Sequence, residues 1–497
     1  MSKNRHRVTE SKPAWWTRLD TLRIDLRSLA LFRIFLGISV LYNLIVVKWS
    51  YAVQFYGAHT ILPHLVQLNV NGANSYSIFS VIHNDTFAYV FIATGILTSA
   101  LLTLGVYSRI MAWATLFIFW NLIQASSYYC FGFDFYTFQM LFWACFLPLD
   151  AHFAILPKAR FKPALSFSIV ILFQIAWVYF ATGLAKYGPS WSEGFAVRVM
   201  LMDRWTGNAA GTWLSEQPVL YALLTYFTLV AEYLFPFAVF DFTKGKWLRY
   251  FGVLFLFVFH LTIFSMYSVA NFSISGFAVA CLLLPNIFWR RLEEGFRFTR
   301  PVELPSVRWT QRQRKLAWTF CIFAIVVILE KNLDFLSRHS AFRKEDSAPI
   351  AIDIPSPVKT SFFLQYWKMF APNPPSLIGW WTLEGEKDGK PYDFMAERPV
   401  TNDTFPLWHP TGYEYYLAMY SRNFPVKERG DKFKLFLKYW IPYMKAKKGI
   451  SGPVNLAYFN YLVLDQSAPY TPRIEKTLVP DTFFTNVRYV IEQDPSQ

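Results

Sequence analysis

Five ionisable side chains lie within or at the ends of long apolar segments: Arg33, Asp134, Lys186, Glu232 and His260. An ionisable group inside a membrane span is costly unless it has a partner or a function. Each of the five is therefore a candidate functional residue. The amine and the imidazole are the two groups that could exchange protons near neutral pH in dry surroundings.

Lys186 ends the apolar segment QIAWVYFATGLA and precedes YGPSWSEG. The aromatic residues around it, Trp191 among them, predict a dry environment that lowers the pKa of the lysine and lets it act as a base. This role requires that no carboxylate pairs with the amine, so we expect Glu193 to point away. The alternative is an interfacial lysine whose ammonium group extends to water.

His260 lies in the middle of LFLFVFHLTIFSMYS. A neutral imidazole here can bind a ligand or a metal, or relay a proton. The alternative is a hydrogen bond between two helices. Glu232, in TLVAEYLFPF, lies one helical turn before Pro236. We expect it to pair with Arg33 or with a backbone group that the proline leaves free.

Asp134, in FGFDFYTFQ, lies near the outer end of its segment, where the alternative is a solvated loop end. Three polar groups on three separate spans would be costly to expose to lipid. We therefore predict that Asp134, Lys186 and His260 converge on a membrane-embedded pocket that opens to the outer face. The further residues expected to line this pocket are Glu232, Arg33 and Trp191.

Membrane-spanning helices must position these residues. The chain is 54% hydrophobic and 16% charged, whereas soluble proteins are about a quarter charged. A helix needs about 20 apolar residues to cross the hydrocarbon core. The sequence has about nine such segments, at 30–48, 88–107, 111–129, 132–149, 165–185, 219–241, 250–269, 272–289 and 316–336. Segments 132–149 and 272–289 are short enough to be tilted or partly re-entrant.

Lysine and arginine concentrate in alternate connections: in residues 1–28, at Arg109, and in 158–162, 244–249 and 290–315. The positive-inside rule places these connections in the cytoplasm, and an odd number of spans places residues 337–497 outside it. The net charge of +15 follows this membrane pattern. We therefore expect the lipid bilayer as a partner, and no nucleic acid. The cysteines show no CxxC or Cys/His spacing, so no metal site is predicted.

Three regions follow: a cytoplasmic basic N-terminus (1–28), a transmembrane helical bundle (29–336) and a C-terminal extracytoplasmic domain (337–497). The last region follows the proline-containing stretch IDIPSPVKT. It is expected to hold a hairpin turning at 387–389, a helix in 431–448, and strands near 454–464 and 484–491. The predicted fold class is a polytopic α-helical membrane protein with a C-terminal α+β extracytoplasmic domain.

Ordered segments carry a resemblance over roughly residues 20–290: LRIDLRSLALFRIFLGISVLYNLI, FYGAHTILP, LTLGVYSRIMAWATLFIFW, VYFATGLAKYGPSWSEG, AEYLFPF and FVFHLTIFSMYSVANFSISGFAVACLLLP. They resemble the vitamin K-dependent gamma-carboxylase-like family, also called the HTTM (horizontally transferred transmembrane) domain family. The tract LQYWKMFAPNPP is similar to the segment that follows the membrane region in bacterial members. The segments with Lys186 and His260 are the most specific parts.

The eukaryotic carboxylase of that family oxygenates reduced vitamin K to make a strong base, which removes a γ-proton from a protein glutamate before CO2 adds. Its quinol-deprotonating lysine aligns with Lys186, and the histidine of its FH segment aligns with His260. The resemblance thus implies a reduced quinone as cofactor and an exported polypeptide as substrate. The family enzyme has a histidine where this chain has Phe135. That difference favours the alternative, a non-enzymatic maturation, export or scaffold factor for a secreted peptide.

Overall fold

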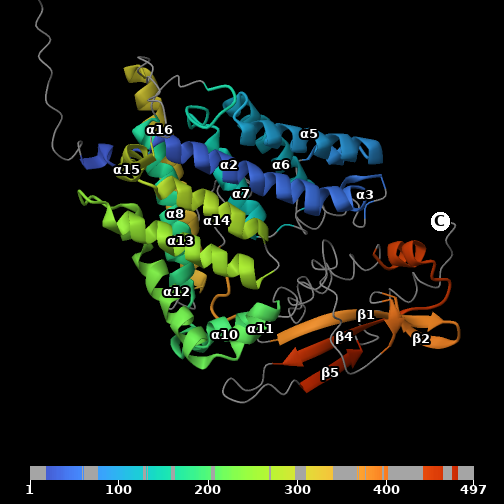
Figure 1. The fold of residues 1–497 in the computed structure, drawn as a ribbon. Helices are drawn as coiled ribbons and strands as arrows, with labels where there is room; N and C mark the ends of the chain where they lie inside the picture. Colours follow the sequence, from blue (N-terminus) through green and yellow to red (C-terminus); the bar gives the residue numbers. More distant parts are fainter. Residues whose placement is uncertain are drawn as a thin grey trace, which may run out of the picture.

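The computed structural model of the chain combines a large helical bundle with a small β-sheet at one end of it (Figure 1). The structure describes residues 18–58, 60, 77–126, 130, 132–157, 163–202, 208–267, 270–296, 309–339, 367, 369–374, 377–394, 397–400, 440–462 and 473–478. Every statement below concerns these residues.

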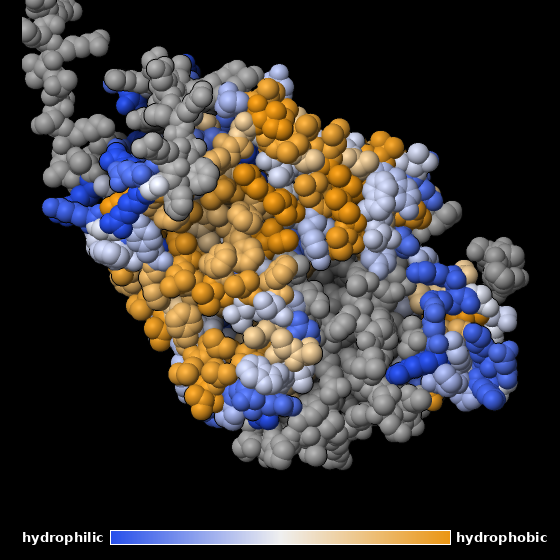
Figure 2. Space-filling model, viewed as in Figure 1, coloured by the Kyte–Doolittle hydropathy of each residue, from blue (hydrophilic) through white to orange (hydrophobic). Residues whose placement is uncertain are grey.

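Six helices are long and apolar enough to cross a membrane, among the residues described. The first combines α2 (Leu26–Tyr42), a π-helical turn (Asn43–Lys48), a 3-10 turn (Trp49–Tyr51) and α3 (Ala52–Tyr56). The others are α5 (Asp85–Leu104), α8 (Leu165–Ala185), α12 (Pro218–Val239), α13 (Trp247–Met266) and α16 (Gln311–His339). The protein is therefore a helical, multi-pass membrane protein. Figure 2 shows the matching hydrophobic surface over much of the bundle.

The remaining predicted spans are helices that are too short, too bent or not apolar enough to be among these six. The helix α6 (Ser108–Ala125) falls outside the six, and α7 (Gly132–Ala144) has 13 residues. At about 1.5 Å per residue, α7 is about 20 Å long, shorter than the roughly 30 Å hydrocarbon core. The pair α14 (Ala270–Leu283) and α15 (Asn286–Phe296) bends by 86° and makes at most a seventh span. Pro285 lies at this break and cannot continue the backbone ladder of α14.

Basic connections meet at one end of the bundle, which we call the basic end. A guanidinium N–H of Arg23, before α2, donates to the carbonyl of Pro163, before α8. The Lys246 Nζ, in the turn between α12 and α13, donates to the Thr21 Oγ1 at 3.3 Å. Segments far apart in the sequence are thus joined on one face.

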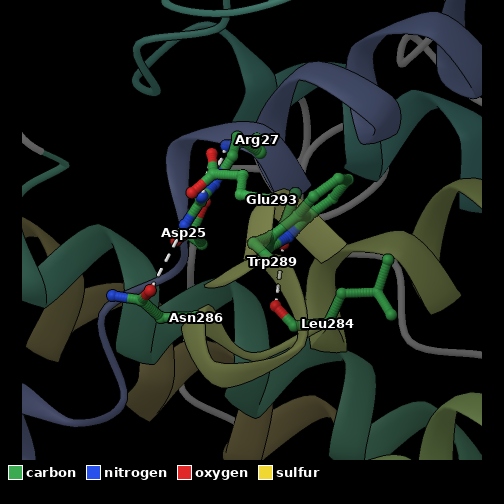
Figure 3. Close-up of polar contacts among 7 residues, drawn as sticks. Asp25, Arg27, Leu284, Asn286, Trp289 and Glu293 are labelled. Carbon is green, nitrogen blue, oxygen red and sulfur yellow. Dashed lines mark hydrogen bonds and ion pairs between the residues drawn. The ribbon is translucent and has the colours of Figure 1, made fainter. Parts of the chain in front are cut away.

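A polar cluster fastens α15 to the start of α2 at the basic end (Figure 3). Arg27 pairs with Asp25 at 2.8 Å and with Glu293 of α15 at 2.5 Å. The Trp289 Nε1 donates to the Ser28 Oγ at 2.8 Å. These contacts hold α15 across the basic end, where it lies after the bend.

The opposite end, which we call the sheet end, carries α9 (Pro189–Ser192), α10 (Ala196–Leu201) and α11 (Ala209–Ser215). Beside α11 lies the antiparallel sheet in the order β3-β2-β1-β4-β5 (Figure 1). The strands are β1 (Leu377–Lys387), β2 (Lys390–Asp393), β3 (Arg398–Pro399), β4 (Asn455–Leu462) and β5 (Arg473–Leu478).

The predicted hairpin is confirmed, because β1 and β2 pair through a turn at Asp388 and Gly389, both with positive φ (54° and 72°). Two left-handed residues in succession suit the twist of a two-residue hairpin. The strand predicted near 454–464 is β4, and residues 440–448 are helical within the predicted helix. The strand predicted at 484–491 lies outside the described residues.

Candidate functional site

Lys186 lies at the C-terminal end of α8 and is almost completely buried. Its Nζ lies 2.5 Å from the Oε1 of Glu232 on α12, and the two side chains are 4% and 2% exposed. The ring of Trp191, in α9, covers the ammonium group at 4.5 Å from its centroid. The helices α8 and α12 therefore meet in a buried ion pair, at the sheet end of α8.

This pair contradicts the expectation that Lys186 has no carboxylate partner. Glu193 is exposed, as expected, but the carboxylate comes from the other helix. The physical reason is that a lone buried ammonium and a lone buried carboxylate are each costly, and pairing offsets part of both costs. A carboxylate partner favours the protonated amine, so Lys186 alone does not fit the role of a neutral base. The interfacial alternative is also wrong, since the amine does not extend to water.

Glu232 pairs with Lys186 and not with Arg33 or a freed backbone group, so that expectation is wrong. The Oε2 of Glu232 has no hydrogen-bond partner in the described part of the chain. Arg33 lies at the basic end, where its guanidinium donates to the carbonyls of Leu149 at 2.8 Å and His152 at 3.3 Å. Arg33 thus fastens the loop before α8 and lies apart from the ion pair.

His260 is fully buried in α13 and hydrogen-bonds to α8. Its Nε2 lies 2.8 Å from the hydroxyl of Tyr179, and its Nδ1 has no partner among the described residues. The hydroxyl of Tyr136, on α7, lies near Tyr179 but outside hydrogen-bonding geometry. His260 therefore makes the hydrogen bond between two helices that was the alternative to a functional role. Its Nδ1 can still bind a ligand.

Tyr179 links the two predicted residues, and sequence reasoning missed it. It precedes Lys186 by seven residues, two helical turns, so both side chains lie on one face of α8. It is also close enough to Glu232 to interact with it electrostatically. The seven-residue spacing was the available signal. Lys186, Glu232, Tyr179 and His260 together form the candidate site.

Asp134 belongs to a neighbouring polar group. Its Oδ1 accepts a hydrogen bond from the Asn43 Nδ2 at 2.8 Å, and Asp134 is fully buried, so it is not a solvated loop end. Lys48, also buried, and Asp134 both act electrostatically on Cys130. Asp134 does not touch Lys186, which contacts Glu232 and Trp191. Convergence of Asp134 on one pocket with Lys186 stays a prediction.

No family model, curated protein or solved structure matches this chain. The residues that the structure describes contain no group of three or more His, Cys, Asp or Glu able to hold a metal ion. Three buried polar atoms in or beside the site have no hydrogen-bond partner among the described residues: the Oε2 of Glu232, the Nδ1 of His260 and the hydroxyl of the neighbouring Tyr136.

The His260 ring packs directly on the backbone of Gly276 in α14. A Cβ atom at position 276 would lie 2.1–2.2 Å from three atoms of the imidazole. We expect Gly276→Ala to displace the ring from Tyr179 and to lower the stability by about 1–3 kcal/mol through overpacking. Thermal unfolding in lipid nanodiscs measures this loss.

The matched control is Gly295→Ala in α15, where an added Cβ meets nothing within 4 Å. Alanine is a better helix former than glycine, so this control should be neutral or slightly stabilising. Equal unfolding temperatures for Gly276→Ala and the wild type would contradict the close packing of the His260 ring on Gly276.

Proposed function

We propose that this chain is a bacterial-type HTTM-family protein related to vitamin K-dependent gamma-carboxylase, and that it is a quinol-dependent enzyme modifying an exported polypeptide. The observation that carries the proposal is the buried Lys186–Glu232 pair beside the Tyr179–His260 hydrogen bond. Buried ionisable groups gathered in one place are typical of functional sites.

The polar atoms of the site are of the kinds that would contact a planar molecule with hydroxyl groups. The unpartnered Glu232 Oε2 can accept a hydroxyl proton, and the His260 Nδ1 and the Tyr136 hydroxyl offer two further polar contacts. The Phe272 ring contacts two of these residues, with its centroid 4.9 Å from that of His260 and 6.3 Å from that of Tyr136. Aromatic walls with a few polar atoms are what a ring-shaped cofactor requires.

Because Lys186 is paired with Glu232, the proton acceptor in this proposal is the carboxylate and not the lysine. With a reduced quinone bound, Glu232 would accept the hydroxyl proton and become neutral, while Lys186 would keep its charge and stabilise the oxygen that lost the proton. The net charge of the buried site does not change, which avoids the cost of creating a lone charge there. A bound reduced quinone would supply the electrons for the later oxidation.

The experiment that tests this function uses purified protein in lipid. Reduced quinone, oxygen, labelled bicarbonate and a glutamate-containing exported peptide are added together. We expect quinol oxidation, and label in the peptide if the activity is gamma-carboxylase-like. Absence of quinol oxidation with every quinone tried would contradict the enzyme and leave the maturation, export or scaffold factor. The closed ion pair favours that second candidate, because it already ties α8 to α12 without any ligand.

The proposal includes a topology of nine spans, a cytoplasmic N-terminus and an extracytoplasmic C-terminal domain, 337–497. The joining of basic connections at one end supports the cytoplasmic assignment of that end through the positive-inside rule. A reporter that is active only after export, fused after Gln497, should be active. The same reporter fused between α12 and α13, after Lys244, should be silent. Activity of the second fusion with silence of the first would contradict this orientation.

A further inference from the structure

A short segment after the bundle, residues 369–374, lies over the loop that follows α8; we call it the strap. Three hydrogen bonds join the two, each 3.0 Å long. The backbone N–H of Gly188 donates to the carbonyl of Pro372, and that of Ser190 to the Oδ1 of Asn373. The third donor is the indole Nε1 of Trp191, which the Phe370 carbonyl accepts.

The third bond connects the strap to the ion pair. Trp191 is 1% exposed, and its ring lies over the ammonium group of Lys186. The strap thus holds the indole that covers Lys186. Ala371 of the strap also packs against the buried cluster of Leu336 and Ala185, the residue before Lys186. Displacing the strap would release both of these contacts at once.

The loop is shaped for the strap. A Cβ atom at Gly188 would lie 2.2–2.3 Å from the side-chain atoms of Asn373, so only glycine leaves room for that amide. The strap is partly exposed, but the positions on either side of its exposed part are buried. Trp367, two residues before the strap, is 2% exposed and packs edge-on against Tyr136 at 5.8 Å, whereas Phe370 within the strap is 39% exposed. Pro374, at the other end of the strap, is buried.

We infer that the strap is a lid, which lifts from residues 188–191 to open the Lys186–Glu232 pair and closes again over it. The inference rests on the proposed function, because a substrate must reach a pair that is closed in this structure. The packed helices α8 and α12 hold the two side chains of the pair. The strap covers the loop that follows α8, and only three hydrogen bonds and a small apolar contact hold it there. Such a contact opens more readily than a packed helix pair.

Hydrogen exchange tests the lid without any activity measurement. In the wild type, the amides of Gly188 and Ser190 should exchange faster than the central amides of α8. Asn373→Ala removes the acceptor of the Ser190 amide and should speed its exchange by about tenfold, the effect of one hydrogen bond. Asn286→Ala, at the basic end, removes an amide of the same kind and should leave Ser190 unchanged. If Ser190 exchanges only as slowly as central α8, or if Asn373→Ala leaves it unchanged, the lid is excluded.

A reversible lock tests the coupling to function. The close approach of positions 188 and 373 suits a disulfide in Gly188→Cys/Asn373→Cys. We expect oxidation to stop quinol turnover in this variant and reduction to restore it, with the wild type unaffected by the same treatments. Full turnover in the oxidised variant would overturn the lid. If the wild type itself oxidises no quinol, the proposed function fails, and the exchange experiment alone decides on the lid.

Discussion

Replacing Lys186 with methionine should lower the free energy of unfolding by about 3–5 kcal/mol, because it leaves a buried carboxylate without its counter-charge. Glu232 is 2% exposed, and its Oε2 has no other partner among the described residues. Water therefore cannot take over the role of the ammonium group. Thermal unfolding of the purified variant in nanodiscs, compared with the wild type, measures the loss.

Two further variants separate the ion pair from simple loss of a side chain. The double variant Lys186→Met/Glu232→Leu removes both charges and should recover most of the lost stability, since an apolar pair of similar volume replaces a buried salt bridge at little cost. Lys448→Met breaks the exposed Lys448–Glu397 pair and should cost less than about 1 kcal/mol. Equal losses for Lys186→Met and Lys448→Met, or no recovery in the double variant, would contradict the buried pair.

Apolar patterning predicted the helices well because each span needs only local information. Each of the nine predicted segments overlaps a helix in the described residues, and one of them, 165–185, has the bounds of α8. Composition alone does not determine how many of these helices cross the membrane. The 13-residue α7 and the bend at Pro285 depend on how a helix is buried against its neighbours, which hydropathy does not report.

Ionisable residues in apolar segments identified positions that matter, but not their partners. Lys186 and His260 are buried in the bundle, as predicted. The pairing of Lys186 with Glu232 depends on the relative register of α8 and α12, which are 46 positions apart at this contact. No local pattern contains that register. A carboxylate in the middle of a span was nevertheless visible, and the cost of leaving it unpaired favours a buried cation as its partner without identifying which one.

The position of the strap could not be predicted from the sequence. The tract LQYWKMFAPNPP stood out in the sequence, yet its position over residues 188–191 follows from three hydrogen bonds between segments about 180 residues apart. Main-chain donors and acceptors exist at almost every residue, so their pairing cannot be inferred from residue types. The space that Gly188 leaves for the Asn373 side chain follows from the three-dimensional positions of both residues and not from the sequence.

The central claim is that the buried Lys186–Glu232 pair carries proton chemistry on a reduced quinone. Single substitutions cannot test it alone, because Lys186→Met is expected to destabilise the fold. The double variant Lys186→Met/Glu232→Leu should remain folded while it lacks both groups. It therefore separates a loss of chemistry from a loss of structure.

The most direct measurement is the rate of quinol oxidation by the purified wild type and by this double variant, in the same nanodiscs and below both unfolding temperatures. Removing a general base lowers a rate by roughly 100-fold to 10,000-fold. We predict oxidation by the wild type and a loss of at least about 100-fold in the folded double variant. Oxidation at the wild-type rate by a double variant that lacks both charges would contradict it.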